Sequence, residues 1–216
     1  MYRRVVGSIC GRYYVDDDTA REIEKLIRQV DEKMKRETKV EPVKLAAKDI
    51  HPSEISPILT ASQGRLKCVW QRWGFPGGGA EGRKKQLIFN ARSESALEKP
   101  FFRDSILHRR AVIPAAGFYE WSRNREKNVF YREGRPVLFM AGCFRHYEDG
   151  ERFVILTTSA NASMRPVHDR MPLVLEREEV AAWILDGERT EGFLRGTPPL
   201  LSRRTDYEQM DLADYF

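Results

Sequence analysis

A series of short apolar runs, broken by glycine and proline, limits the folds open to this chain of 216 residues. Each run has the length of a strand rather than a helix, and turn-forming residues bound most of them. The sequence therefore predicts a mainly antiparallel β core. The expected strands are Leu66–Trp70, Gln86–Phe89, Ala111–Ala116, Val137–Phe144, Phe153–Thr158 and Leu173–Leu175.

Three segments carry a helical pattern instead. Thr19 and Glu22 form a capping box, and apolar residues recur behind them at helical spacing, which predicts a helix over residues 19–36. Residues 100–107 begin with proline and predict a short helix, and residues 178–185 place apolar side chains on one face. Helices packed on the outside of one β core define an α+β domain.

Composition excludes several classes of protein. Apolar residues make up 41% and charged residues 32%, a globular balance, and no apolar run reaches the length of a transmembrane helix. The net charge of +5 permits a polyanionic partner without demanding one. Three cysteines with no metal spacing predict neither a disulfide framework nor a metal site, and they favour a reducing cytoplasm.

Cys10 stands beside Gly11 and Arg12, and a neighbouring arginine favours a reactive thiolate. The residues alone leave two interpretations open. Cys10 is either an activated nucleophile or a small apolar residue that opens a strand. Cys68 and Cys143 lie inside apolar runs, so we expect both in the core.

Three further polar residues are candidates for chemistry. Glu120 follows an apolar segment and should be partly desolvated, which raises a carboxyl pKa toward the range of general acid–base catalysis. A solvated carboxylate at a strand edge is the alternative. His168 lies in a polar loop, where it either transfers protons or is a capped surface histidine. Asn90 ends a strand, either as a turn former or as a partner for a substrate oxygen.

Arginine and tryptophan near these positions suit a nucleic-acid ligand. Guanidinium groups bind phosphate and indole rings stack on bases, although a generic charged surface is the alternative interpretation. Trp70 and Trp73 stand next to the glycine-rich loop expected over residues 76–85, on its N-terminal side. The arginines concerned are Arg12, Arg92, Arg103 and Arg170.

Five separated motifs occur together in one order. They are Cys10-Gly-Arg-Tyr, Trp73-Gly-Phe, Asn90-Ala-Arg-Ser-Glu, Arg110-Ala-Val-Ile-Pro-Ala-Ala-Gly-Phe-Tyr-Glu-Trp121 and Val167-His-Asp-Arg-Met-Pro172. In this combination the chain closely resembles the SOS response-associated peptidase family, the abasic-site processing proteins. The resemblance runs from about Cys10 to Glu208.

The resemblance implies one α+β domain over residues 10–216, with a twisted, mainly antiparallel, barrel-like β core and peripheral helices. It also implies a monomer that binds single-stranded DNA containing abasic sites, without a cofactor or a metal. As the first residue, Cys10 would capture the aldehyde of an abasic site as a thiazolidine. The other implied catalytic residues are Asn90, Glu120 and His168. The implied DNA contacts are Arg12, Trp73, Arg92, Arg103 and Arg170, with Trp73 stacking on, or wedged beside, an adjacent base.

Residues 1–9 depart from this pattern, because they leave the Cys10 nitrogen in a peptide bond, where it cannot form a thiazolidine. A later start, a leader that is not native, or proteolysis would each expose it. Two other functions stay open at this point. One is a cysteine peptidase that acts through Cys10 and His168, with Asn90 or Glu120 as a candidate third residue, on itself or on peptides. The other is a non-covalent single-strand-binding module.

Overall fold

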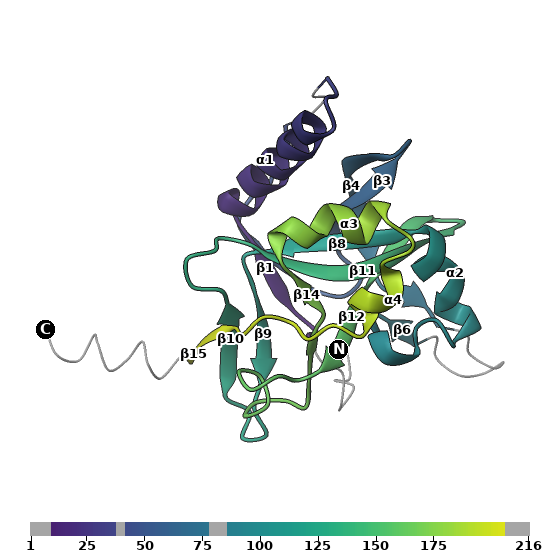
Figure 1. The fold of residues 1–216 in the computed structure, drawn as a ribbon. Coiled ribbons are helices and arrows are strands. Elements are labelled where there is room, and N and C mark those ends of the chain that lie inside the picture. Colours follow the sequence, from purple (N-terminus) through teal and green to yellow (C-terminus); the bar gives the residue numbers. More distant parts are fainter. Residues whose placement is uncertain (1–9, 38–41, 78–85, 206–216) are drawn as a thin grey trace, which may run out of the picture.

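The computed structural model describes residues 10–37, 42–77 and 86–205. The expected leader, residues 1–9, and most of the expected loop over residues 76–85 lie outside the described residues. The described strands form a five-stranded sheet, an eight-stranded sheet and one short pair, and the helices lie over the eight-stranded sheet (Figure 1).

The larger sheet closes on itself. Its strands are mostly antiparallel, but β12 runs parallel to β4 and to β7. Because β11 also pairs with β12, the strands β12, β4, β3, β8 and β11 form a ring, which is the barrel-like core. The sheet order is β13 (Arg170–Pro172), β12 (Gly150–Ser159), β4 (Arg65–Trp73), β3 (Ile55–Ser62), β8 (Arg110–Ala115), β11 (Leu138–Tyr147) and β14 (Val174–Leu175), with β7 (Asn90–Arg92) beside β12.

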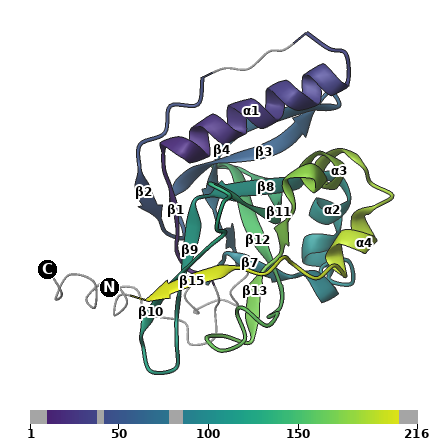
Figure 2. The same cartoon turned by 60° about the vertical axis from the view of Figure 1, so that its left-hand side comes forward.

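The smaller sheet packs against this ring. Its order is β15 (Ser202–Thr205), β10 (Lys127–Tyr131), β9 (Gly117–Trp121), β1 (Tyr13–Val15) and β2 (Lys48–Ile50). Figure 2 shows β9, β10 and β15 extending away from the described helices. The short pair consists of β5 (Phe75–Pro76) and β6 (Leu87–Ile88).

Alternate residues of the larger sheet pack into two different hydrophobic clusters. On β8, Val112 packs with the helices, whereas Ala111 and Ile113 pack with the smaller sheet. Tyr13 and Phe118 belong to the second cluster and are fully buried. Since both sides of β8, β11 and β12 are largely covered, these strands form nearly continuous apolar runs. The expected strands of this sheet are confirmed, including β4, which is partly exposed.

Helix α1 (Asp17–Lys33) begins earlier than the sequence predicts. Asp16, rather than Thr19, is the N-cap: its carboxylate accepts a hydrogen bond from the Thr19 backbone nitrogen at 2.9 Å, and the Thr19 hydroxyl accepts one from the Asp16 nitrogen at 3.2 Å. The predicted capping box is therefore wrong by one turn. Acidic residues in the first turn favour the earlier start, because negative charge stabilises a helix N-terminus.

The remaining helices agree with their expected positions. Helix α2 (Pro100–His108) begins at its proline, and α3 (Val180–Leu185) follows a 3-10 turn over Arg177–Glu179. The short helix α4 (Thr190–Leu194) has no counterpart in the sequence expectations. A second 3-10 turn, Ser93–Ser95, follows β7.

A glycine on β11 allows three strands to approach closely. A Cβ atom added to Gly142 would lie 2.4 Å from the Val154 carbonyl oxygen and 2.5 Å from the Ile113 Cδ1 atom. Gly142→Ala should therefore destabilise the protein by about 1–3 kcal/mol through overpacking, measured by urea unfolding. Gly192→Ala is the matched control, because no atom lies within 4 Å of the added Cβ. An equal loss of stability in both variants would contradict the packing argument.

Candidate active site

Cys10 lies directly in front of β1 and is fully buried. Pairing of β1 with β9 places Tyr13 opposite Phe118, and the Tyr119 nitrogen donates to the Arg12 carbonyl oxygen at 2.9 Å. This register brings Cys10 to Glu120, which is 110 positions away in the sequence. The Cys10 backbone nitrogen donates a hydrogen bond to the Glu120 Oε2 atom at 2.9 Å.

Glu120 is buried on the inner side of β9, with 7% of its surface exposed. Burial raises the pKa of its carboxyl group above the ordinary value. Hydrogen bonds from the backbone nitrogens of Cys10 and Trp121, and the nearby charge of His168, oppose that rise without cancelling it. The carboxyl group can therefore hold a proton closer to neutrality than an exposed glutamate can, beside the Cys10 nitrogen.

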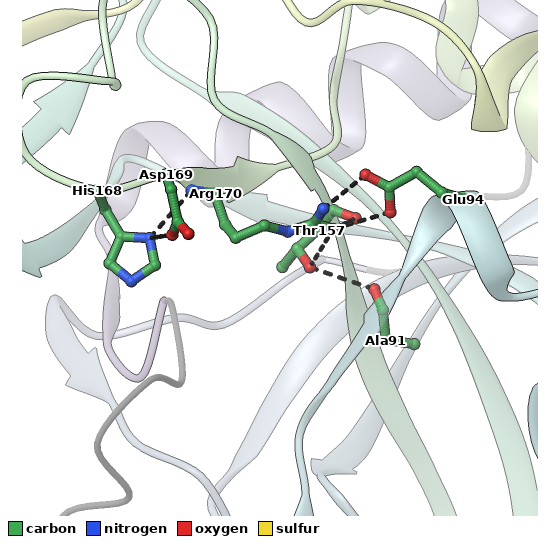
Figure 3. Close-up of polar contacts among 6 residues, drawn as sticks. All are labelled: Ala91, Glu94, Thr157, His168, Asp169 and Arg170. Atoms are coloured by element: carbon green, nitrogen blue, oxygen red, sulfur yellow. Dashed lines mark hydrogen bonds and ion pairs between the residues drawn. The ribbon is translucent and has the colours of Figure 1, made fainter.

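His168 lies in the loop between β12 and β13 (Figure 3). Its Nδ1 atom accepts a hydrogen bond from the Arg170 backbone nitrogen at 3.0 Å and also lies 2.9 Å from the Asp169 Oδ1 atom. Assigned from these contacts, the neutral ring carries its proton on Nε2, whereas a protonated ring could donate from Nδ1 to Asp169. The loop thus holds the His168 ring through contacts at its Nδ1 atom.

Asn90 is the first residue of β7 and pairs with Ile155 of β12 in a parallel register. Its neighbour Phe89 accepts hydrogen bonds from the Ile155 nitrogen at 3.1 Å and from the Trp73 indole at 2.9 Å. The main chain before Asn90 is therefore fixed by two strands. The role of Asn90 toward a substrate oxygen remains a prediction.

Trp73 does not lie on a surface. The ring is fully buried, 5.1 Å from the Tyr13 ring, 5.6 Å from Phe89 and 6.3 Å from Phe153. A base cannot reach a ring enclosed in this way, so the predicted stacking of Trp73 on DNA is wrong. Burial is favoured because the indole ring has a large apolar surface and because its N–H donates to the Phe89 carbonyl oxygen.

Arg170 is already held by protein groups. Its guanidinium forms two hydrogen bonds to the Glu94 carboxylate, at 2.5 and 2.9 Å, and one to the Thr157 carbonyl oxygen at 2.6 Å (Figure 3). A phosphate would have to compete with this bidentate pair. Glu94, the last residue of the Asn90-Ala-Arg-Ser-Glu motif, is thus a site residue that the sequence reasoning quoted but did not single out.

The other arginines differ in their surroundings. Arg92 is exposed at the end of β7. Arg12 lies over the Trp121 ring, with its Cζ atom 5.4 Å from the ring centre, and 3.6 Å from the Asp49 carboxylate. Arg103 is exposed on α2, and its place at the site remains a prediction. Among the described residues no group of three or more acidic, histidine or cysteine side chains could hold a metal ion.

Comparisons with known proteins identify the family and the fold of this chain. The family model for SOS response associated peptidase (SRAP) matches residues 9–210, so the chain belongs to the SRAP family. The solved structure of a phage-related protein from Bordetella bronchiseptica superimposes with a TM-score of 0.71 over 91% of this chain and 93% of that chain, at 20% identity. The α+β fold with a barrel-like core is thereby confirmed.

Two relatives carry the same printed description. Abasic site processing protein YedK of Escherichia coli (strain K12) is 26% identical over 184 residues, which cover 82% of this chain and 79% of the relative. Abasic site processing protein YoaM of Bacillus subtilis (strain 168) is 30% identical over 148 residues, which cover 63% of this chain and 64% of the relative. The chain thus matches just under two thirds of the length of the Bacillus protein. No described helix is long and apolar enough to cross a membrane.

Replacing Glu120 by glutamine should change how stability depends on pH. Because burial raises the Glu120 pKa, the folded protein holds this proton more tightly than the unfolded chain does. The bound proton stabilises the folded protein fully below the ordinary carboxyl pKa. This contribution to the unfolding free energy is lost as pH rises through the raised Glu120 pKa. We therefore expect the unfolding free energy of Glu120→Gln to improve relative to wild type between about pH 4 and pH 7. Urea unfolding across this range measures the difference, and a constant difference would contradict the prediction.

Proposed function

We propose that this protein processes abasic sites in single-stranded DNA by joining them covalently to Cys10. The observation that carries the proposal is the 2.9 Å hydrogen bond from the Cys10 nitrogen to buried Glu120. It sets a candidate nucleophilic nitrogen, a thiol on the same residue and a proton-exchanging carboxyl group in one place. Membership of the SRAP family and the printed names of the relatives support the same substrate.

The proposed reaction has two bond-forming steps. The α-amine of Cys10 attacks the aldehyde carbon of the ring-opened sugar, and the resulting carbinolamine loses water to give an imine. The sulfur then adds to the same carbon while the thiol proton passes to the imine nitrogen. The product is a five-membered thiazolidine, and one water molecule is released overall without an oxidant or a reductant.

Glu120 would manage the protons of these steps. A protonated carboxyl group beside the nitrogen can donate to the departing oxygen, and the carboxylate can afterwards take a proton from nitrogen. His168 would move the proton that opens the sugar ring. Asn90 would hold the sugar by neutral hydrogen bonds, and Arg92 and Arg12 would hold flanking phosphates.

The state of the Cys10 thiol favours this route over a cysteine peptidase. Burial, and then the negative charge of Glu120, raise the thiol pKa well above its ordinary value. A thiol peptidase needs the opposite shift, because its nucleophile is the thiolate. In the thiazolidine route the amine attacks first, so a protonated thiol is an acceptable second nucleophile.

The chemistry requires that Cys10 begin the chain. Cys10 has a φ angle of 51°, in the left-handed region that a residue with a Cβ atom adopts rarely. This conformation carries strain only while a residue precedes Cys10, because φ is defined through the preceding carbonyl carbon. Relief of that strain supports hydrolysis of the bond between residues 9 and 10 as the step that frees the amine.

Protein that begins at Cys10 should form a heat-stable adduct with single-stranded DNA carrying an abasic site. Cys10→Ala should abolish the adduct, because neither ring closure nor the sulfur bond is then possible. Cys68→Ala is the matched control, since Cys68 lies on β4 and plays no part in the reaction. Denaturing gels measure the adduct. An equal yield from Cys10→Ala would overturn the mechanism.

The same assay tests the residues before Cys10. Protein that keeps residues 1–9 attached should form the adduct only as those residues are lost, which intact-mass analysis follows in the same samples. Adduct formation by protein of unchanged mass would contradict the requirement for a free amine.

Glu120→Gln should slow the crosslinking reaction without weakening DNA binding. Glutamine keeps the shape and a hydrogen-bonding end but cannot exchange a proton reversibly. We expect single-turnover crosslinking to slow by about 100-fold, the low end of general acid–base contributions, with DNA affinity almost unchanged. A thermal melt of the same preparation controls for folding. An unchanged rate with a shifted melt would make Glu120 a structural residue.

A further inference from the structure

The five-stranded sheet has a second face, which points away from the core. Phe118 and Glu120 on β9 point inward, so Tyr119 and Trp121 between and beyond them point outward. The register extends this face to β1 and β10, where Tyr14 pairs with Gly117 and Lys127 pairs with Trp121. We call it the outer face, and its members are Tyr14, Tyr119, Trp121, Lys127, Tyr131 and Arg204.

The described helices leave the outer face uncovered. They lie over the eight-stranded sheet in both views, whereas β9, β10 and β15 project beyond them (Figures 1 and 2). The side chains of Tyr119, Trp121 and Tyr131 are partly exposed. An aromatic surface of this kind, on a sheet with a filled opposite side, is available to a ligand.

Gly117 shapes this face. A Cβ atom at Gly117 would lie 2.6 Å from the Tyr14 Cε1 atom and 2.8 Å from its hydroxyl oxygen, so the Tyr14 ring lies across the glycine. The centre of the Tyr14 ring is 5.5 Å from that of Tyr119. Because Phe130 pairs with Phe118, the next residue of β10, Tyr131, lies beside Gly117. Three tyrosines on neighbouring strands therefore form a continuous aromatic surface.

Cations lie among these rings. The Lys127 ammonium is 4.9 Å from the centre of the Tyr119 ring, and the Arg204 guanidinium is 5.7 Å from that of Tyr131. Arg12 covers the edge nearest Cys10, over Tyr119 and Trp121.

Two carboxylates, Asp16 and Asp49, lie near the same group; burial raises the Tyr14 pKa, and both carboxylates raise it further. Asp49 accepts a hydrogen bond from the Tyr119 hydroxyl at 2.9 Å and pairs with Arg12. Burial and that hydrogen bond raise the Tyr119 pKa to about 12, so the tyrosine stays neutral. Three cations, Arg12, Lys127 and Arg204, outnumber the two carboxylates near these rings, so the net charge of the group is positive.

We propose that the outer face binds single-stranded DNA, with bases stacked on Tyr119, Tyr14 and Tyr131 and phosphates held by Lys127 and Arg204. Stacking on rings that alternate with cations is how sheet surfaces hold single strands without reading their sequence. The inference rests on the proposed function, because the bound strand is the one that carries the abasic site. Arg12 and Trp121 join the two regions, since each is next or nearly next in sequence to Cys10 or Glu120.

Oligothymidines of two lengths test the outer face apart from the crosslink. Undamaged strands of about 5 nucleotides fit the Cys10 site alone, whereas strands of about 15 nucleotides can reach the outer face. We expect Tyr131→Ala to weaken binding of the long strand about tenfold and to leave the short strand unchanged, measured by fluorescence anisotropy. Tyr131→Phe keeps the ring and should bind as wild type does.

Salt dependence tests the cations. Lys127→Ala should reduce the slope of log K against log salt for the long strand by about 0.7, the value for one lost contact with a single strand. Lys67→Ala is the matched control, because Lys67 is equally cationic but is exposed on β4 of the other sheet. The control should keep the wild-type slope. Melting temperatures of all variants establish that each is folded.

The two proposals fail separately. Outer-face variants should crosslink a short abasic strand at the wild-type rate, because they leave Cys10 and Glu120 intact. Absence of any adduct with wild-type protein beginning at Cys10 would overturn the crosslink, while the length and salt measurements still decide the outer face. Folded Tyr131→Ala and Lys127→Ala proteins that bind the long strand as wild type does would overturn the outer face. If Lys67→Ala reduced the slope of log K against log salt as much as Lys127→Ala does, that result would also overturn the outer face.

Discussion

The hydrogen bond between the Cys10 nitrogen and the Glu120 carboxylate is the contact on which the site depends. A carboxyl group with so little exposure is costly to ionise unless donors face it. The two backbone nitrogens that face Glu120 come from Cys10 and Trp121, one distant in sequence and one adjacent. The chain segment at Cys10 is thus bound to β9 by the same contact that would later serve the chemistry.

The two sheets decide what each side of β9 can do. The ring of five strands and its helices fill the core, so the inner side of β9 is dry and shifts the Glu120 pKa upward. The outer side of the same strand carries Tyr119 and Trp121, one residue away from Glu120. Because strand residues alternate in direction, a reactive side and a ligand-binding side can be built on one five-residue strand.

Arg170 shows how a basic residue of the candidate site can serve structure. Its pair with Glu94 ties the segment after β7 to β13, and its contact with Thr157 ties both to β12. The Arg170 backbone nitrogen, in turn, fixes the His168 ring. The arginine therefore positions the histidine loop, a role that its charge alone does not reveal.

The sequence by itself determined the α+β class, helix α2, the family and most long strands of the ring, but not β3. These depend on local patterns: apolar runs of strand length, a proline at a helix start and five ordered motifs. Only the tertiary structure decided the short strands β1 and β9, the burial of Trp73, the Arg170–Glu94 pair and the meeting of Cys10 with Glu120. A three-residue strand such as β1, or an ion pair such as Arg170–Glu94, forms only because residues far apart in the sequence meet in the fold. A local window of sequence does not contain that information.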